Sequence, residues 1–155
     1  MITIRSAEPG DWPGIQVVEA AAVATLRETY RPNEAALVYR AQHHGNLHRL
    51  VATMNGEVVG TVQYRLTNQS LRIIDLGVRS DFRRRGAAHA LLGFIEEIGK
   101  KEGADLLQLA TVKETGNVAI FHRLGFEVVS EKEDKFSVSQ HLVVLTDVEM
   151  EKRLR

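Results

Sequence analysis

Cysteine is absent from the 155-residue chain, which excludes disulfide bonds, thiolate metal sites and a cysteine nucleophile. Net charge is absent too, because 20 lysine and arginine residues balance 20 aspartate and glutamate residues. This balance removes the whole-protein electrostatic argument for nucleic acid or an anionic membrane as a partner. Any site for an anion must therefore be local.

Long apolar runs are missing as well. No stretch approaches the roughly 20 apolar residues that span a bilayer, and the N-terminal sequence MITIRSAEPGDW lacks the apolar core of a signal peptide. The six histidines include no His-x-x-x-His pair with the flanking glutamate of metalloproteases. We therefore expect a soluble, cytoplasmic protein without a metal, and the missing cysteine is compatible with that compartment.

The length and composition are those of one ordinary globular domain. Apolar residues make up 44% of the chain and charged residues 26%, which is close to the average for soluble proteins. A chain of this length forms a single core readily, and it contains no internal repeat, low-complexity tract or linker. We expect one domain over residues 1–155.

Hydrophobic periodicity predicts an alternation of strands and helices in the order β-α-α-β-β-β-α-β-α-β-β. Asp11 is expected to cap the first helix, Asn33 the second, and the Asn55-Gly56 pair is a strong hairpin signal. The expected elements are a strand at 2–7, a helix with apolar residues from Ile15 to Leu26, a helix at 35–42, two strands within 47–66, a strand at 71–78, a helix from 88 that Gly103 ends, a strand at 104–112, a short helix at 116–124, and strands at 126–131 and 138–150.

The segment DFRRRGAAHALL, at 81–92, places three arginines where a helix begins after a buried strand. A helix start presents unpaired N–H groups and partial positive charge, which together favour an anion. Gly86 permits close approach of a ligand, Ala87 and Ala88 keep the first turn small, and arginine matches phosphate geometry. The pattern predicts a pyrophosphate site.

Three other interpretations of this segment remain open. A P-loop requires Gly-Lys-Ser/Thr at the helix start, where this chain has Gly-Ala-Ala, and a dinucleotide fingerprint requires three glycines where only Gly86 is suitably placed. A run of arginines is also typical of a solvated basic loop. The small residues at the helix entry favour the phosphate site over that last interpretation.

The residues 83–88, Arg-Arg-Arg-Gly-Ala-Ala, match the pattern Arg/Gln-x-x-Gly-x-Gly/Ala of the acetyl-CoA motif in the GNAT family of N-acetyltransferases. With the preceding IIDLGVRSDF and the later RLGFEVVSE, nearly the whole chain resembles that family. The resemblance implies an α/β fold, with a mixed, mostly antiparallel sheet and a splayed central pair of parallel strands. It also implies acetyl-CoA as cosubstrate and an amine of a small molecule or peptide as acceptor.

The same resemblance assigns roles on the donor side. Backbone amides from Arg84 to Ala88 would bind the pyrophosphate of coenzyme A, and the side chains of Arg83, Arg84 and Arg85 would assist. The main chain of Leu76, Gly77 and Val78 would pair with the pantetheine arm, and Asn117 would contact it. The Leu76 N–H would polarise the thioester carbonyl.

The residues that would act as general base and general acid in the transfer are less clearly indicated than the residues that would bind acetyl-CoA. Asp75, the acidic residue within the strand at 71–78, is a candidate base acting through water or a purely structural aspartate. Phe121 stands where the family often has a tyrosine acid, beside the pantetheine site, and it has no proton to donate. His122 or water is the alternative acid.

The resemblance places the acceptor between the first two helices and the closing strands, with Tyr30, Arg31 and Tyr64 as candidate wall residues. Arg27, Arg31 and Arg40 hint at an acceptor carrying a carboxylate or phosphate. We expect direct transfer in a ternary complex without a covalent enzyme intermediate. Two other functions remain as alternatives: a non-catalytic coenzyme A sensor, and a nucleic-acid binder that uses the three arginines. The sequence is also compatible with a homodimer.

Overall fold

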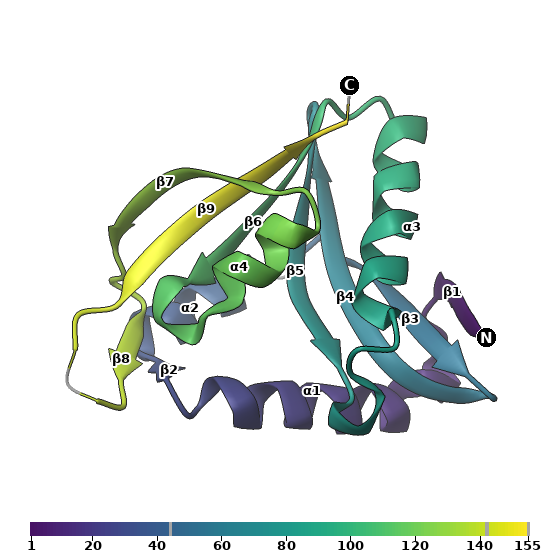
Figure 1. Ribbon diagram of the computed structural model, residues 1–155, viewed down its shortest axis with the longest axis horizontal. Coiled ribbons are helices and arrows are strands. Elements are labelled where there is room, and N and C mark those ends of the chain that lie inside the picture. Colours follow the sequence, from purple (N-terminus) through teal and green to yellow (C-terminus); the bar gives the residue numbers. More distant parts are fainter. Residues whose placement is uncertain (44, 142, 155) are drawn as a thin grey trace.

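A mixed sheet forms the centre of the computed structural model, which describes residues 1–43, 45–141 and 143–154 (Figure 1). Within these residues seven strands follow the order β1-β3-β4-β5-β6-β9-β7, and only β5 and β6 pair in parallel. The mostly antiparallel sheet is therefore confirmed. The strands are β1 (Ile2–Ser6), β3 (His48–Met54), β4 (Glu57–Thr67), β5 (Ser70–Val78), β6 (Leu106–Val112), β7 (Glu127–Glu133) and β9 (Thr146–Arg153).

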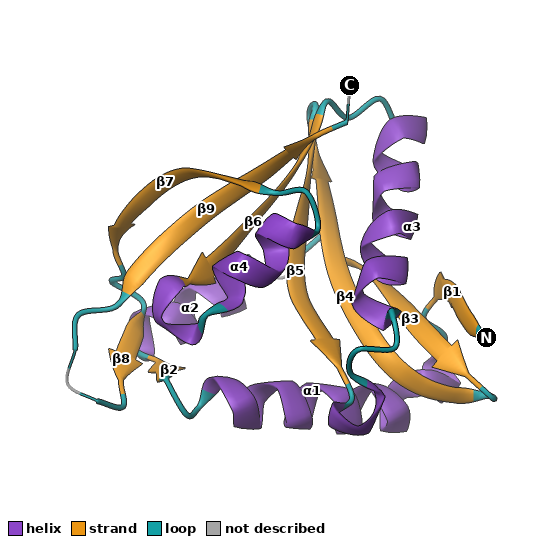
Figure 2. Ribbon diagram, in the orientation of Figure 1, coloured by secondary structure: helices purple, strands orange, loops and turns teal. Residues whose placement is uncertain are grey.

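In the described part of the chain, four α-helices and three 3₁₀ turns connect the strands (Figure 2). The helices are α1 (Trp12–Leu26), α2 (Glu34–Gln42), α3 (Ala87–Lys101) and α4 (Asn117–Arg123), and the turns are Pro9–Asp11, Ser80–Phe82 and Lys113–Thr115. None of the helices in the described residues is both long and apolar enough to cross a membrane.

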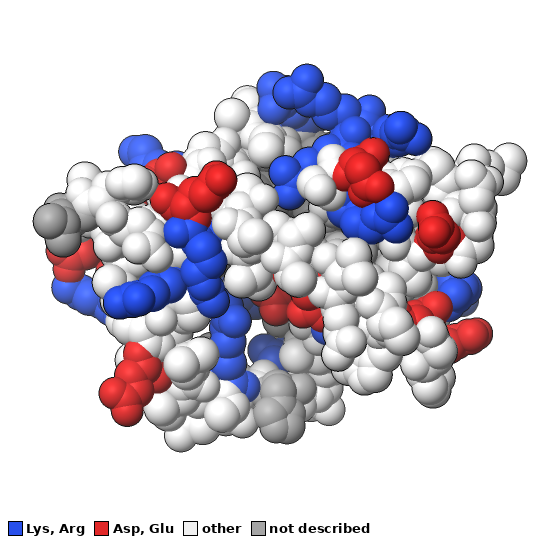
Figure 3. All heavy atoms as spheres, turned by 90° about the horizontal axis from the view of Figure 1, so that it is seen from below, with Lys and Arg blue, Asp and Glu red and all other residues white. Residues whose placement is uncertain are grey.

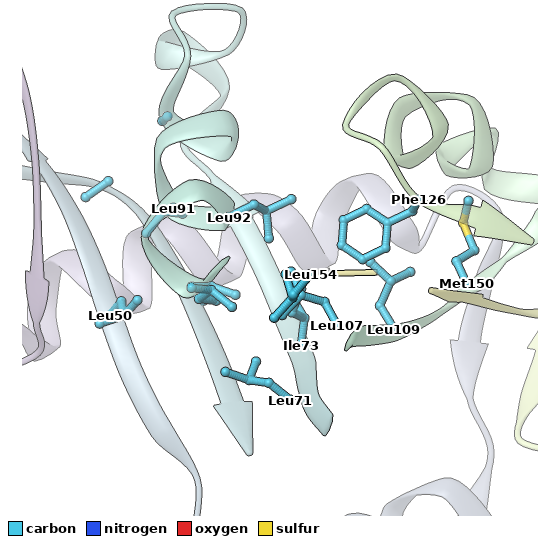
Figure 4. Packing of buried hydrophobic residues seen from close by; sticks show 14 of the residues in the cluster. Leu50, Leu71, Ile73, Leu91, Leu92, Leu107, Leu109, Phe126, Met150 and Leu154 are labelled. Atoms are coloured by element: carbon cyan, nitrogen blue, oxygen red, sulfur yellow. The ribbon is translucent and has the colours of Figure 1, made fainter. Parts of the chain in front are cut away.

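Strand alternation places α1 and α3 on opposite faces of the sheet. Leu50 and Ala52 of β3 belong to the core beneath α3, whereas Val51 between them packs with Ile15 and Val18 of α1. On the α3 side, Leu91 and Leu92 of the helix reach the sheet (Figure 4). Further along, Leu109 and Met150 of the sheet lie near the ring of Phe126 (Figure 4).

The parallel strands β5 and β6 separate soon after they meet. They pair only from Ser70 opposite Leu106 to Arg72 opposite Gln108, and the rest of each strand diverges (Figure 1). The expected splayed central pair is confirmed, and the opening between its arms lies toward the C-terminal ends of both strands.

A bulge in β5 lies at the same opening. Gln63 of β4 pairs with Ile74 and Thr61 pairs with Gly77, so two residues, Asp75 and Leu76, lie opposite one. Asp75 has a φ of 51°, in the left-handed region that aspartate and asparagine tolerate better than most residues. The sequence pattern of β5 did not predict this bulge.

The prediction of one closing strand over 138–150 was wrong in extent, and residue 142 of it lies outside the described residues. The Ser139 hydroxyl accepts hydrogen bonds from the N–H groups of His141 and Val143, which turns the chain out of the extended form. As a result β8 (Ser137–Ser139) pairs with β2 (Tyr30–Pro32) in a separate two-stranded sheet, and β9 begins only at Thr146.

Of the two predicted helix caps, one is confirmed. The Asn33 side-chain oxygen accepts a hydrogen bond from the Ala36 N–H at 2.9 Å. The Asp11 carboxylate does not cap α1. It faces backward, accepting from the Glu8 N–H at 2.7 Å and from the Arg5 guanidinium at 2.7 and 2.8 Å, because a 3₁₀ turn precedes the helix.

Candidate active site

The opening between β5 and β6 leaves main-chain groups of β5 without a neighbouring strand. From Ile73 onward, β5 has no paired residue in β6. Asp75 and Leu76 also lack a paired residue in β4, because they form the bulge. A backbone donor or acceptor in this position is available to an extended ligand that enters between the strands.

The loop from β5 to α3 passes beside this opening and ends in a helix N-terminus (Figure 2). Arg84 has a φ of 63° and Gly86 a φ of 88°, so two residues just before the helix have a left-handed backbone conformation. The Ala90 N–H donates to the Gly86 carbonyl at 2.9 Å, which makes it the first amide that the helix itself satisfies. The amides before it form an electropositive start to α3.

Space around Gly86 suits a bulky anion. A Cβ built on Gly86 meets no described heavy atom within 4 Å, so the surface above it is open. Ala87 is buried and Ala88 half-buried, so the first two residues of the helix have only methyl side chains. The start of α3 is therefore open to a bulky group above Gly86.

Arg83 and Arg85 of the loop contact different parts of the structure. The Arg85 guanidinium lies over the Phe82 ring, 5.0 Å from its centroid, and Arg79 lies over the same ring at 4.7 Å. Arg83 donates to the Thr25 hydroxyl of α1 at 3.1 Å, so its side chain links the loop to a helix as well as adding charge. Figure 3 views the molecule from the side of α1, and Lys and Arg side chains gather along one edge of that face.

The bulge that contains Asp75 adjoins a part of β5 that α1 covers, and Tyr30 lies in β2, the strand that follows α1. α1 packs on β5, because a Cβ on Gly77 would lie 3.2 Å from the Ala22 methyl group. Burial raises the pKa of the Tyr30 hydroxyl, and charges nearby also act on it, with Arg40 and Arg27 lowering it and Asp134 and Asp75 raising it. The Asp75 side chain itself is exposed, so a solvent-linked base has the access it needs.

Two predicted acceptor residues lie elsewhere. β2 alternates, so Tyr30 and Pro32 face inward while Arg31 is exposed on the outer side. Tyr64 packs against the core beneath α3 and stacks on His48, with ring centroids 5.1 Å apart. Burial raises the pKa of the Tyr64 hydroxyl, and the negative charge of the Glu102 carboxylate raises it further.

The residues of α4 divide between core and solvent. Phe121 packs inward, in edge contact with Phe126 at 6.1 Å between centroids. His122 is exposed, and its Nδ1 lies 3.7 Å from the Glu127 carboxylate. Asn117 is half-buried at the helix start, where its N–H donates to the Thr115 hydroxyl at 3.3 Å. His122 therefore does not share the inward face of α4 that Phe121 occupies.

The sequence did not lead us to predict an ion pair that lies where β5 and β6 are still paired, at the closed end of the opening. Arg72, at the last paired position of β5, donates to the Glu149 carboxylate of β9 at 2.6 and 3.2 Å and thus reaches across β6. The signal was present in the sequence, because Asp147, Glu149 and Glu151 alternate along one strand. The pair itself could not be predicted, because it depends on β9 lying next to β6 on the side away from β5.

A pocket lies between β7, β9 and the segment leading to β8. Burial raises the pKa of the Asp147 carboxyl there, and the carboxylates of Asp134 and Glu149 raise it further. The lining residues are Lys132, Glu133, Asp134, Lys135, Phe136 and Asp147. This pocket therefore carries charge of both signs beside an aromatic ring.

Comparison with known proteins agrees with this geometry. A family model described as the acetyltransferase (GNAT) family matches residues 15–126. The ribosomal-protein-S18-alanine N-acetyltransferase from Escherichia coli is 17% identical, with a TM-score of 0.76 over 99% of this chain and 94% of that one.

Two further solved structures share the fold. The PaiA N-acetyltransferase from Thermoplasma acidophilum, solved in complex with coenzyme A, is 18% identical, with a TM-score of 0.74 over 99% of both chains. A GCN5-related N-acetyltransferase from Kribbella flavida is 23% identical, with a TM-score of 0.74 over 98% of this chain and 97% of that one. Since the family model spans more than half of the sequence, the chain belongs to the GNAT family of acetyltransferases.

Proposed function

We propose that the protein is an acetyl-CoA-dependent N-acetyltransferase that acts on a primary amine by direct transfer in a ternary complex. One observation carries the proposal: the strand opening between β5 and β6 lies next to an electropositive, unobstructed helix start. A nucleotide thioester with a long extended arm fits both parts at once. The coenzyme A complex of the PaiA neighbour supports the choice of ligand.

The residues of this chain fit acetyl-CoA on the donor side. The amides from Arg84 to Ala88 would hold the pyrophosphate, assisted by the exposed side chains of Arg84 and Arg85. Main-chain groups of Leu76, Gly77 and Val78, on the arm of β5 that has left β6, would pair with the pantetheine. Asn117, half-buried at the start of α4, would be a second contact for the same arm.

Acetyl-CoA supplies an acetyl thioester, and its transfer to an ammonium group forms a C–N bond, breaks the C–S bond and yields the amide, the thiol of coenzyme A and one proton. Asp75 would accept the proton of the amine through a water molecule, since its carboxylate is exposed at the bulge. The Leu76 N–H would donate to the acetyl oxygen, where negative charge develops. We assign protonation of the sulfur to water, because Phe121 has no donor and His122 lies on the exposed side of α4.

Two measurements test this function. Calorimetry with acetyl-CoA should show one binding site per chain, and thiol release should appear with at least one member of a panel of primary amines. Binding without turnover of any amine would instead support a non-catalytic coenzyme A sensor, which the phenylalanine at position 121 favours. Absence of binding would refute both functions.

The role of Asp75 has its own test. Asp75→Asn preserves the left-handed backbone, because asparagine tolerates that region, so the fold should persist. We expect kcat to fall by about 10²-fold, the scale of a lost general base, with a flattened pH–rate profile. Glu97→Gln, on an exposed position of α3, is the matched control. An unaltered pH profile in Asp75→Asn would remove it as the base.

A further inference from the structure

The main sheet consists of two halves that are joined along a short stretch. Within the described strands, β1, β3, β4 and β5 form one half and β6, β9 and β7 the other, and the halves meet where β5 pairs with β6 (Figure 1). That pairing covers three positions, from Ser70 to Arg72, whereas β6 pairs with β9 over seven. Two strands held together at one end can rotate about that end. The pairing alone therefore does not fix the angle at which β5 and β6 separate.

The ion pair of Arg72 with Glu149 crosses the division between the two halves. Arg72 occupies the last paired position of β5, and its guanidinium passes over β6 to the Glu149 carboxylate of β9 at 2.6 and 3.2 Å. The exposed fractions of the two side chains are 33% and 27%, so water and salt screen this pair less than a fully exposed one. Among residues 1–43, 45–141 and 143–154, it is the one ion pair that links a strand of one half to a strand of the other.

The pair holds the face of the sheet that the core does not hold. The chain neighbours of Arg72 and Glu149 belong to the core beneath α3, and they are Leu71, Ile73, Val148 and Met150. Side chains alternate along a strand, so Arg72 and Glu149 project from the opposite face. At the point where β5 and β6 part, apolar packing therefore restrains one face and the ion pair restrains the other.

Resting on the proposed function, we propose that Arg72 is a positioning residue that, through its ion pair with Glu149, fixes the angle of the opening for the pantetheine arm. An extended chain between two strands requires them to stand about two strand spacings apart, or roughly 10 Å. Without the ion pair β5 would swing toward β6, because the unpaired main-chain groups on both arms can pair with each other. The pantetheine arm would then have to separate the strands before it could bind.

Ligands with and without the pantetheine arm test this role. Calorimetry compares coenzyme A with ADP, which carries a pyrophosphate but no such arm. Arg72→Gln should raise the Kd for coenzyme A about 10-fold, the scale of coupling through a neighbouring element, and leave the Kd for ADP unchanged. An equal rise for ADP, or an unchanged Kd for coenzyme A, would overturn the proposal.

Arg72 and Glu149 should also act as one unit. Glu149→Gln keeps the size and shape of the side chain and should reproduce the rise in Kd, so it carries the test if Arg72→Gln does not fold. The double variant Arg72→Gln/Glu149→Gln should bind coenzyme A no more weakly than either single variant, because each single variant already lacks the ion pair. Additive effects of the two substitutions would contradict an action through the pair.

Arg5→Gln is the matched control. Arg5 also makes two hydrogen bonds to one carboxylate, that of Asp11 at 2.7 and 2.8 Å, but this pair joins β1 to the turn before α1. Arg5→Gln should lower stability toward urea without changing the Kd for either ligand. A rise in the Kd for coenzyme A as large as that of Arg72→Gln would show general destabilisation and overturn the proposal. A wild-type protein that does not bind coenzyme A would instead refute the proposed function, so the two failures are distinguishable.

Discussion

The left-handed backbone conformation of Gly86, with a φ of 88°, shapes the proposed phosphate site. Gly86→Val should raise the Kd for acetyl-CoA at least 10-fold, because a branched side chain would occupy the open space above the helix start. It should also cost roughly 1–3 kcal/mol of stability, the usual price of a non-glycine residue in the left-handed region. Calorimetry and urea unfolding measure the two effects.

Gly103→Val is the matched control for that substitution. Gly103 has a φ of 81° and, like Gly86, no described atom within 4 Å of an added Cβ, but it lies beyond the far end of α3. The strain should therefore be similar while the Kd stays unchanged. If Gly86→Val bound acetyl-CoA as tightly as Gly103→Val does, the amide cradle would be excluded.

Asp11 gives a pH-dependent prediction for stability. The hydrogen bonds from Arg5 and then from the Glu8 N–H lower the pKa of its carboxyl from 3.8 to about 2. A carboxyl whose pKa is lower in the folded state than in the unfolded state stabilises the folded state at pH values above the unfolded-state pKa. This contribution disappears as the pH falls to the folded-state pKa. Asp11→Asn should therefore cost about 1 to 2 kcal/mol above pH 4 and progressively less toward pH 2.

Urea unfolding of the wild type and Asp11→Asn at several pH values measures that difference. Glu97→Gln, whose carboxylate is 75% exposed, serves as the control and should show almost no difference at any pH. A difference between wild type and Asp11→Asn that is constant from pH 7 to pH 2 would show that packing, not the carboxylate, is responsible.

Among the elements, α1 depends on one close approach to the sheet. A Cβ on Gly14 would lie 2.8 Å from the Val58 Cβ, which cannot rotate away, so the helix would have to move. Gly14→Ala should cost about 1–3 kcal/mol by overpacking. Gly93→Ala, in the middle of α3 with nothing within 4 Å, should instead stabilise the protein by roughly 0.5–1 kcal/mol. Opposite signs in chemical denaturation are the expected result.

Sequence reasoning succeeded for elements whose signals are local. The Asn55-Gly56 turn joins β3 and β4, and both residues have positive φ values, 53° and 80°, as this hairpin type requires. The apolar stripe of α3 and the glycine at the start of the helix were likewise visible in the chain. Local turn chemistry and helical periodicity do not depend on distant partners, which is why they could be predicted.

Features that depend on distant segments could not be predicted. The β2–β8 sheet joins residues more than a hundred positions apart, and neither three-residue strand has a periodicity of its own. The bulge at Asp75 requires knowing how β4 and β5 align, and the contact of Arg83 with Thr25 requires knowing where α1 crosses the loop. Arg31 is exposed where its neighbour Tyr30 is half-buried, and Tyr64 packs against the main core.

The whole molecule should respond to its ligand as one unit. If residues 1–155 form a single domain, thermal unfolding will be one cooperative transition. Acetyl-CoA at 100 times its Kd should add about 2.7 kcal/mol of stability, which for a domain of this size is a rise in Tm of roughly 5–10 °C. Calorimetric scans test both points, and Gly86→Val should lose most of the rise.

The two-stranded sheet of β2 and β8 has a consequence for how new specificities arise. It ties the segment carrying Tyr30, Arg27 and Arg40 to the segment before β9, and neither β2 nor β8 pairs with the main sheet that bears the proposed donor site. Exchanging residues 27–43 and 134–141 together between homologues would transfer a matched pair, whereas exchanging either alone would break their pairing. If the acceptor binds beside Tyr30, as the family resemblance implies, replacing these two segments together should change the acceptor without altering the residues proposed to bind the donor.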